Sequence, residues 1–473
     1  MPVTGKLLKD QWDALALASA VLLVLSFVLG GASQNHALRL ALVELAALPV
    51  LVLAAGRIVQ TGLWREHRLA LALMAALVAI PLIQLIPLPP AIWTGLPGRD
   101  QMVLALELAG LEPGWTPLSL TPDRTWRSAL ALTPPVAFFL AVLSMSHIQR
   151  ERTVHLLIAA AVAGILLGAA QLVSGGDRLY LWHWTDAGSV NGFFANRNHL
   201  ASSLLITLPF AITMGASTLR RRDRGTSALW LGALFAGLVV VALAAIRSRA
   251  GIALFAPVMV ASLLAAWIAA GRGRPGPGLL LLVGSVGAAL TIVAVLALPP
   301  ILARFDIQSA PEGRFDRWPL VAEAAQTYLP LGAGMGSFDA VYRSVEPLEQ
   351  LDSTFFNQAH NEYLETWLEA GWLGIGLVIA FSIWWFRRSW SAWRAPPSRE
   401  GDLQRAASIA IGVALLHSIG DYPLRTVTLA VVFALCCGIL ELSGRPPQPR
   451  SRAEAKTRSR NHSSRTVRPM DGR

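Results

Sequence analysis

Apolar stretches of about 20 residues recur along this chain, and they limit the folds available to it. That length lets an α-helix cross the hydrocarbon core of a bilayer, where only helices and closed barrels satisfy every backbone polar group. Membrane barrels use alternating segments of about ten residues, whereas these stretches are continuously apolar. The sequence therefore predicts an all-α polytopic membrane protein.

Twelve transmembrane helices are predicted, and together with their loops they account for most of the 473 residues. We expect one membrane domain over residues 1–443 and a disordered basic tail over residues 444–473, because the tail is rich in Pro, Ser and Arg and almost devoid of apolar residues. The predicted spans lie near residues 13–32, 38–56, 69–87, 128–146, 153–173, 199–218, 228–246, 250–270, 278–298, 362–386, 403–420 and 424–443.

The positions of Lys and Arg predict the orientation. With the N-terminus inside, the inner segments hold 27 of the 40 basic residues and the outer loops hold 13. A basic excess marks the cytoplasmic side, so both termini are expected there. The basic tail either binds anionic membrane lipids or only sets the topology. Because much of the net charge of +11 lies in this tail, the charge does not indicate nucleic-acid binding. Cys436 and Cys437 are adjacent and fit neither a disulfide nor a metal site.

Polar residues gather in the predicted outer loops, and the first cluster is the segment 191–199. It contains three asparagines, an arginine and a histidine, which is more than the cap of a helix requires. Arg247 and Arg249 form a second cluster in a short outer connection, against the general basic bias. They either extend to the membrane surface or bind an anion, because a guanidinium matches phosphate oxygens.

The largest outer loop, residues 299–361, supplies a third cluster. Arg314 and Arg317 open a predicted amphipathic helix that runs to about Tyr328. The glycine-rich segment 332–338 is predicted to form a sharp turn, since it lacks the strand and the Lys-Ser/Thr of a phosphate loop.

The run His-Asn-Glu-Tyr-Leu-Glu at 360–365 stands where this loop meets the tenth span. Ionisable groups beside a membrane span are costly and tend to be functional. An isolated histidine is usually structural, but His360 is flanked by polar residues and faces the same side as the arginines. The last outer turn adds a smaller group that includes His417 and Asp421.

In this order, the clusters resemble the O-antigen ligase and O-antigen polymerase superfamily, over about residues 10–443. The resemblance implies a helical C-type glycosyltransferase in a Gram-negative inner membrane, with its active site in the periplasm. It rests on Gly192 to His199, Ser248 to Gly251, Gly313, Arg314, Trp318, His360 to Glu365, Gly371, His417, Ser418 and Asp421.

Members of this superfamily pass a glycan from an undecaprenyl diphosphate carrier to an acceptor hydroxyl, without a metal. Ligases use lipid A-core, the acceptor we favour here, and polymerases use another carrier-linked repeat. Some relatives glycosylate proteins. Neither a cofactor nor a metal is expected, because His360, Glu362 and Glu365 do not share one helical face.

The residue chemistry assigns roles for such a transfer. A leaving diphosphate needs fixed cations, and we expect these to be Arg249 and Arg314, joined by Arg247 and Arg317. His360 is expected to act as general base in an inverting displacement, with Glu362 or Glu365 as its orienter or as the next candidate base. The predicted supports of the glycan and acceptor site are Asn196, Arg197, Asn198, Asn361, Tyr363, His417 and Asp421.

A transporter of a small solute or a lipid-linked glycan is the alternative from another class. Transporters usually show internal repeats and charged residues near the middle of the membrane. No repeat is evident in this sequence, and the unusual polar groups gather at one face, with Glu44 in the second span as an exception.

Overall fold

A computed structural model describes residues 13–33, 36–175, 179–182, 189–220, 227–271, 284, 287, 314–351 and 356–442. These residues are almost wholly helical, which confirms the all-α prediction for this part of the chain. The one sheet among them is a small antiparallel ribbon that pairs β1 (Pro87–Leu88) with β2 (Thr116–Pro117).

Seven helical segments of the described part are long and apolar enough to cross a membrane. They are α3 (Ala37–Thr61), α7 with α8 (Pro122–Ala131 and Thr133–Ser144), α9 (His147–Ser174), α10 (Arg197–Ser217, continued by η3, Thr218–Arg220), α11 (Ser227–Ile246), α12 (Arg249–Ala269) and α16 (Glu362–Arg394).

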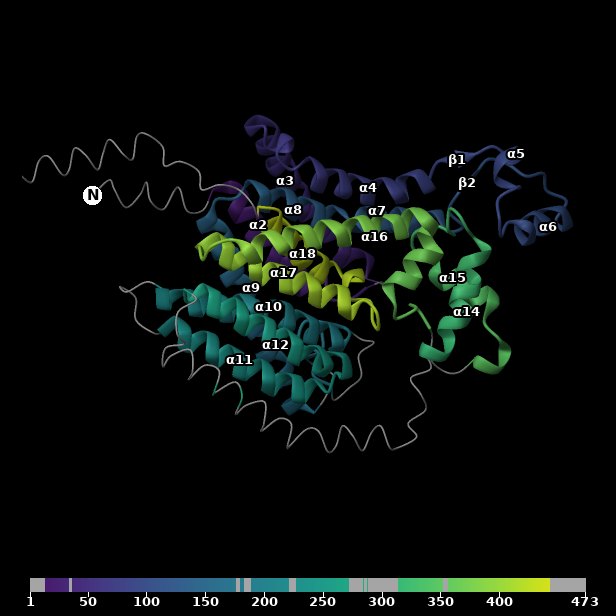
Figure 1. Ribbon diagram of the computed structural model, residues 1–473. Helices are drawn as coiled ribbons and strands as arrows, with labels where there is room; N and C mark the ends of the chain where they lie inside the picture. The colour runs from purple at the N-terminus through teal and green to yellow at the C-terminus, as the bar shows by residue number, and fades with distance from the viewer. Residues whose placement is uncertain are drawn as a thin grey trace, which may run out of the picture.

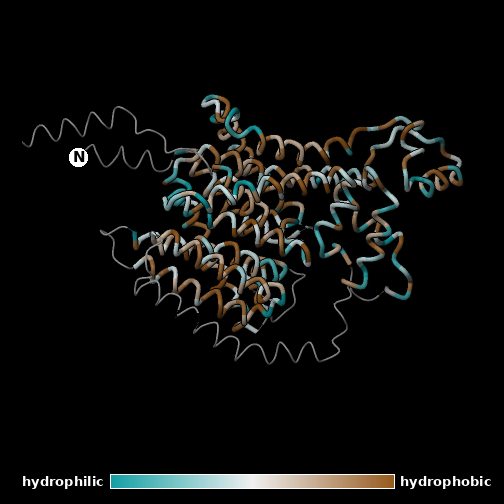
Figure 2. Tube along the Cα trace, in the orientation of Figure 1, coloured by the Kyte–Doolittle hydropathy of each residue, from teal (hydrophilic) through white to brown (hydrophobic). Residues whose placement is uncertain are grey.

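Shorter helices occupy the remaining predicted spans. They are α2 (Ala14–Leu29), α4 (Arg68–Gln84), α17 (Arg399–His417) and α18 (Val427–Glu441). The predicted span at 278–298 falls almost entirely outside the described residues, so the total of twelve stays a prediction. The helices run side by side as a bundle that is hydrophobic along its length (Figures 1 and 2).

Helix α10 is the central helix of one half of the bundle. It has no separate polar face, which is typical of a helix with no exposed side, and nearly all of its residues are buried. Helices α11, α12 and α17 pack around it, while α18 packs between α8 and α17. The start of α10 is therefore held firmly at one end of the bundle.

A polar lobe lies at that same end, on the right of Figure 1. Its helices are α5 (Pro90–Trp93), α6 (Asp100–Leu108), α14 (Arg314–Thr327) and α15 (Phe338–Val345), and the 3-10 turn η4 (Leu348–Gln350) follows α15. Two other 3-10 turns, η1 (Leu63–Arg65) and η5 (Pro423–Arg425), lie elsewhere in the chain. The predicted amphipathic helix after Gly313 is confirmed as α14. A small hydrophobic core that includes Val321, Phe338, Tyr342 and Leu368 joins α14 and α15 to α16.

Buried ion pairs occupy the opposite end of the bundle. Glu441 accepts from His67 at 2.9 Å and from Arg388 at 2.6 Å. Asp402 pairs with Arg220 at 2.7 Å and with Arg405 at 3.0 Å. These residues lie at the end that the basic bias predicts to be cytoplasmic, and they tie the ends of five helical segments together.

A sharp kink divides α16 at Gly371, whose φ is 55° and ψ is −143°. A Cβ atom at this position would lie 2.2 Å from the carbonyl oxygen of Pro330, so only glycine fits. The kink lets the first two turns of α16 pack against the lobe while the rest of the helix follows the bundle. The preceding glycine-rich segment forms turns, as predicted, with Gly332 and Gly334 at positive φ.

Candidate active site

Asp421 lies at the centre of a polar cluster where α10, α16 and the turn after α17 meet. The carboxylate is fully buried. Its Oδ2 accepts a hydrogen bond from Asn198 Nδ2 at 2.7 Å, and its Oδ1 accepts from the backbone N–H of Tyr422 at 2.9 Å. The Asp421 Oδ1 atom also lies 3.4 Å from His360 Nδ1 and 3.8 Å from His199 Nε2.

The two histidines keep Asp421 ionised. Burial raises the pKa of the carboxyl group, but the favourable interaction with the nearby rings of His199 and His360 outweighs burial and holds this pKa well below its usual range. A buried carboxylate beside an imidazole fixes the tautomer of the ring and stabilises its protonated form. This pairing therefore leaves Nε2 of His360 for an incoming group.

His360 is held in a strained backbone conformation, with φ at 50°. Such strain costs about 1–3 kcal/mol and persists where surrounding contacts fix it, often at functional sites. The ring lies 4.8 Å from the ring of Tyr422 and 6.0 Å from that of Phe356, between centroids. Its side chain is 20% exposed, against 1% for Asp421, so His360 is the reachable member of the pair.

His199 is the inner histidine, and it was not among the predicted site residues. It is 1% exposed, and neither ring nitrogen has a hydrogen-bond partner within the described residues. Its ring meets Tyr422 edge to face at 5.1 Å. His199 belongs to the polar segment 191–199 that the sequence analysis identified as a cluster, but nothing in the sequence distinguished it from the other polar residues of that segment.

Glu362 joins the start of α16 to the turn after α17. One carboxylate oxygen accepts from Ser418 Oγ at 2.6 Å and the other from the backbone N–H of Leu424 at 2.7 Å. Its own N–H donates to the carbonyl of Ser418 at 2.9 Å. With both oxygens engaged and the residue 8% exposed, Glu362 is well placed to fix the geometry around His360 and Asp421.

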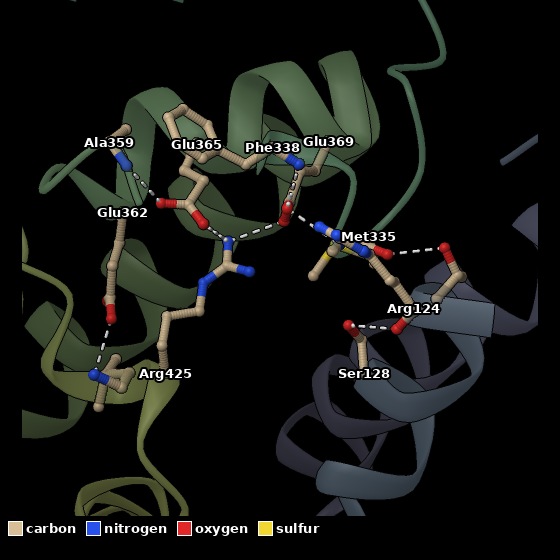
Figure 3. Close-up of polar contacts among 12 residues, drawn as sticks. Arg124, Ser128, Met335, Phe338, Ala359, Glu362, Glu365, Glu369 and Arg425 are labelled. Atoms are coloured by element: carbon tan, nitrogen blue, oxygen red, sulfur yellow. Dashed lines mark hydrogen bonds and ion pairs between the residues drawn. The ribbon is translucent and has the colours of Figure 1, made fainter. Parts of the chain in front are cut away.

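Arg425 bridges two further carboxylates of α16 (Figure 3). Its Nη2 lies 2.8 Å from Glu369 Oε2 and 3.5 Å from Glu365 Oε1. The other oxygen of Glu365 accepts from the N–H of Ala359, directly before His360, at 3.2 Å. The pKa of Arg425 is raised: burial lowers it, but the surrounding glutamates outweigh burial. Neither Arg425 nor Glu369 was predicted as a site residue.

Glu369 extends this network into the lobe. Its Oε1 accepts from the backbone N–H groups of Gly336 at 2.9 Å and Phe338 at 3.3 Å (Figure 3). One short stretch of α16 thus holds three segments in place: the lobe, the residues before His360, and the turn that carries Asp421.

The predicted supporting residues either cap a helix or connect two helices. Asn361 caps α16 by accepting from the N–H groups of Tyr363 and Leu364, both at 3.1 Å. The hydroxyl of Tyr363 donates to the carbonyl of Leu415 at 2.6 Å. Asn196 caps α10 by accepting from the N–H of Asn198 at 2.8 Å. His417 contacts the Ser202 hydroxyl through Nδ1, which ties α17 to α10.

The four predicted cations come from the starts of α12 and α14. Arg247 and Arg249 are exposed at the start of α12. A Cβ atom on Gly251 would lie 2.9 Å from that of Ala201, so the first turn of α12 lies against the first turns of α10, close to Asn198.

The guanidinium of Arg317 lies 4.8 Å from the centre of the Phe356 ring, which contacts His360. Arg314 begins α14, and its side chain lies outside the described residues.

Three helices begin in this region, namely α10, α12 and α16. The N-terminus of a helix carries partial positive charge and favours anions. Arg197, in the first turn of α10, is half-buried and makes no hydrogen bond or ion pair within the part of the chain that the structure describes. In the same part, no group of three or more His, Cys, Asp or Glu side chains is arranged to hold a metal ion.

Residues 233–379 match the family model described as O-antigen ligase. No curated protein matches the chain. The matched region includes Arg249 and His360, whereas Asp421, Arg425 and the start of α10 lie outside it. The match supports, over residues 233–379, the resemblance to the O-antigen ligase and polymerase superfamily that the sequence motifs indicated.

Proposed function

We propose that this protein transfers a glycan from an undecaprenyl diphosphate carrier to an acceptor hydroxyl at the outer face of a bacterial inner membrane. The acceptor that we favour is lipid A-core, followed by a second carrier-linked repeat unit. The observation that carries the proposal is the pairing of His360 with the buried carboxylate of Asp421, among exposed arginines at one end of an apolar bundle. The family match over residues 233–379 supports the same class of reaction.

His360 acts as the general base in this proposal. As the acceptor oxygen attacks the anomeric carbon, its proton passes to His360 Nε2 and the bond from that carbon to the diphosphate oxygen breaks. The Asp421 carboxylate, 3.4 Å from Nδ1, stabilises the imidazolium that forms. General bases typically contribute about 10²–10⁴-fold to the rate. A single displacement of this kind inverts the anomeric centre.

The leaving diphosphate gains negative charge in the transition state, so catalysis requires fixed positive groups around it. Arg249 and Arg247 at the start of α12 are proposed to bind the diphosphate, together with Arg314 and Arg317 from α14. Arginine suits this role because its planar fork of donors matches phosphate oxygens and its charge does not depend on pH. The N-termini of α10, α12 and α16 carry partial positive charge and would also stabilise the diphosphate.

Glu362 and Glu365 are proposed to position the site. Each already accepts a backbone hydrogen bond, from Leu424 and Ala359 respectively. The roles proposed for Asn361, Tyr363, His417 and Asn196 are likewise to hold the helices that carry the reacting groups. Arg197 remains the candidate for direct contact with the glycan or the acceptor, since it is half-buried and makes no contact of this kind within the described residues.

A reconstituted transfer assay tests this proposal. Purified protein in proteoliposomes is supplied with an undecaprenyl-diphosphate-linked glycan and lipid A-core, and the elongated acceptor is measured by mass spectrometry. The proposal predicts the elongated acceptor and free undecaprenyl diphosphate, with no loss of activity in a chelator. Movement of the carrier across the bilayer without any transfer would instead favour the transporter alternative.

A further inference from the structure

His199 is a buried histidine at the start of α10, and the proposed reaction gives it no part. Its ring meets the rings of Phe194 and Tyr422 edge to face, at 6.4 Å and 5.1 Å between centroids. Neither ring nitrogen has a hydrogen-bond partner in the described part of the chain. A buried polar group in this state is costly, so its presence calls for an explanation.

The Nε2 atom of His199 lies close to the carboxylate of Asp421. It is 3.8 Å from Oδ1, the same oxygen that lies 3.4 Å from His360 Nδ1. Both distances exceed the usual N–H···O length of about 2.7–3.2 Å. Hydrogen bonds in active sites are often long before substrate binds and shorten in the reactive complex. One carboxylate oxygen therefore serves two histidines, one that an acceptor can reach and one that it cannot.

The first turn of α10 approaches both oxygens of this carboxylate. Asn198, directly before His199, donates to Asp421 Oδ2 at 2.7 Å. Asn196 caps the same turn, and most residues of α10 are buried. The side chains of Asn198 and His199 thus extend from a firmly packed helix, whereas His360 reaches the carboxylate from the segment before α16.

The surroundings of His199 favour a neutral ring with its proton on Nε2. A neutral imidazole has one N–H group and one acceptor nitrogen, whereas the protonated ring has two N–H groups. Since no acceptor contacts Nδ1 within the residues that the structure describes, a second N–H group would be buried without a partner. The proton on Nε2 instead faces Asp421. A neutral donor orients this carboxylate and leaves its charge to stabilise His360.

We infer that His199 is a positioning residue for glycan transfer, an assignment that rests on the proposed function. Its Nε2–H group donates to Asp421 Oδ1 and keeps that oxygen directed at His360 Nδ1. His199 holds its own proton throughout: the acceptor proton passes to His360, and no bond of the donor or the acceptor forms or breaks at His199. The carboxylate is thus aligned before the imidazolium forms.

Two substitutions at position 199 separate the donated hydrogen bond from the packing of the ring. His199→Phe keeps an aromatic ring and removes the N–H group, whereas His199→Gln supplies an amide N–H group near the position of Nε2. Each is also combined with Asp421→Asn. The control is Ser203→Ala, one turn further along α10, because Ser203 is equally buried and its hydroxyl has no partner within the described residues. The kcat and the KM for the lipid-linked donor are measured in proteoliposomes.

His199→Phe is expected to lower kcat by about tenfold, less than loss of the base itself would, with an unchanged KM for the donor. His199→Gln and Ser203→Ala should keep kcat near the wild-type value. In the Asp421→Asn background, His199→Phe should cause no further loss, because residues that act through one another are not additive. A merely structural effect would lower kcat by the same factor in both backgrounds.

Three results would overturn the assignment while glycan transfer is intact. The first is a wild-type kcat in His199→Phe. The second is an equal fold loss of kcat in the wild-type and Asp421→Asn backgrounds. The third is a loss in His199→Gln as large as that in His199→Phe, since the donated hydrogen bond would then not be the cause.

Nitrogen NMR of detergent-solubilised protein with ¹⁵N-labelled histidine gives a readout that does not depend on transfer. The signals lost in the position-199 variants identify this residue among the nine histidines of the chain. The inference requires a neutral ring that carries its proton on Nε2. A doubly protonated ring, or a proton on Nδ1 alone, would overturn it even if the wild type transfers glycan normally. Absence of transfer by the wild type would instead remove the proposed function, and with it the role inferred for His199.

Discussion

His360 Nδ1 lies 3.4 Å from Asp421 Oδ1, although the two residues belong to different segments of the chain. His360 lies two residues before α16, and Asp421 follows α17. The antiparallel packing of these helices brings the residues together, and Glu362 holds the junction through Ser418 and Leu424. In the proposed reaction, this relationship orients the base and stabilises the charge that it acquires.

Asp421→Asn is expected to lower kcat by about 10²-fold or more, within the range that general bases contribute. The amide keeps an acceptor for Asn198 but loses the negative charge that stabilises the imidazolium. The KM for the lipid-linked donor should change little, because Asp421 is buried. Steady-state kinetics in proteoliposomes checks this, with Asp100→Asn on the exposed start of α6 as control. An unchanged kcat would remove Asp421 from the mechanism.

Arg249→Ala is expected to weaken binding of undecaprenyl diphosphate, and Arg249→Lys should restore little of it. Lysine keeps the charge but lacks the planar fork that binds a diphosphate bidentately. Binding to detergent-solubilised protein measures the effect, and Arg399→Ala at the opposite end of the bundle is the matched control. Equal affinity in all the variants would show that the diphosphate binds elsewhere.

Arg425→Ala is expected to destabilise the protein strongly, because it leaves Glu365 and Glu369 buried together without their cation. Breaking a buried ion pair typically costs about 3–5 kcal/mol. Adding Glu369→Gln to this variant removes one of the uncompensated charges and should recover part of the loss. Thermal unfolding in detergent compares the two. If the double variant were no more stable than the single one, the ion cluster would not be the cause.

Gly371→Ala is expected to reduce stability and expression sharply. The positive φ alone costs a residue with a side chain about 1–3 kcal/mol, and its Cβ would meet the carbonyl oxygen of Pro330 at 2.2 Å. Gly376→Ala is the control in the same helix, since a Cβ there meets no atom within 4 Å. Comparable melting temperatures for these two variants would mean that the kink at Gly371 is not required.

The helical framework was largely predictable from the sequence, because a span leaves a long apolar run. Predicted spans such as 153–173 and 228–246 coincide with α9 and α11. The span predicted at 128–146 was placed less well: the structure begins a helix at Pro122 and interrupts it at Leu132, before Thr133. The amphipathic pattern after Gly313 also located α14, since its apolar side packs on α16.

The details of the site were less predictable. His360 and Asp421 could be assigned to one side of the membrane, but their contact depends on how α16 and α17 pack, which no periodicity records. The roles of Arg425 and Glu369 depend on backbone N–H groups of the lobe, notably those of Gly336 and Phe338. Backbone partners of this kind leave no signature in side-chain patterns.

In the proposed mechanism His360 deprotonates the acceptor, and a single-turnover measurement separates this step from donor binding. Wild type and His360→Ala are loaded with undecaprenyl-diphosphate-linked glycan in proteoliposomes, and acceptor elongation is followed after lipid A-core is added. We expect normal donor binding by the variant and a transfer rate about 10²–10⁴-fold lower. Elongation at the wild-type rate by the folded variant would show that His360 is not the base.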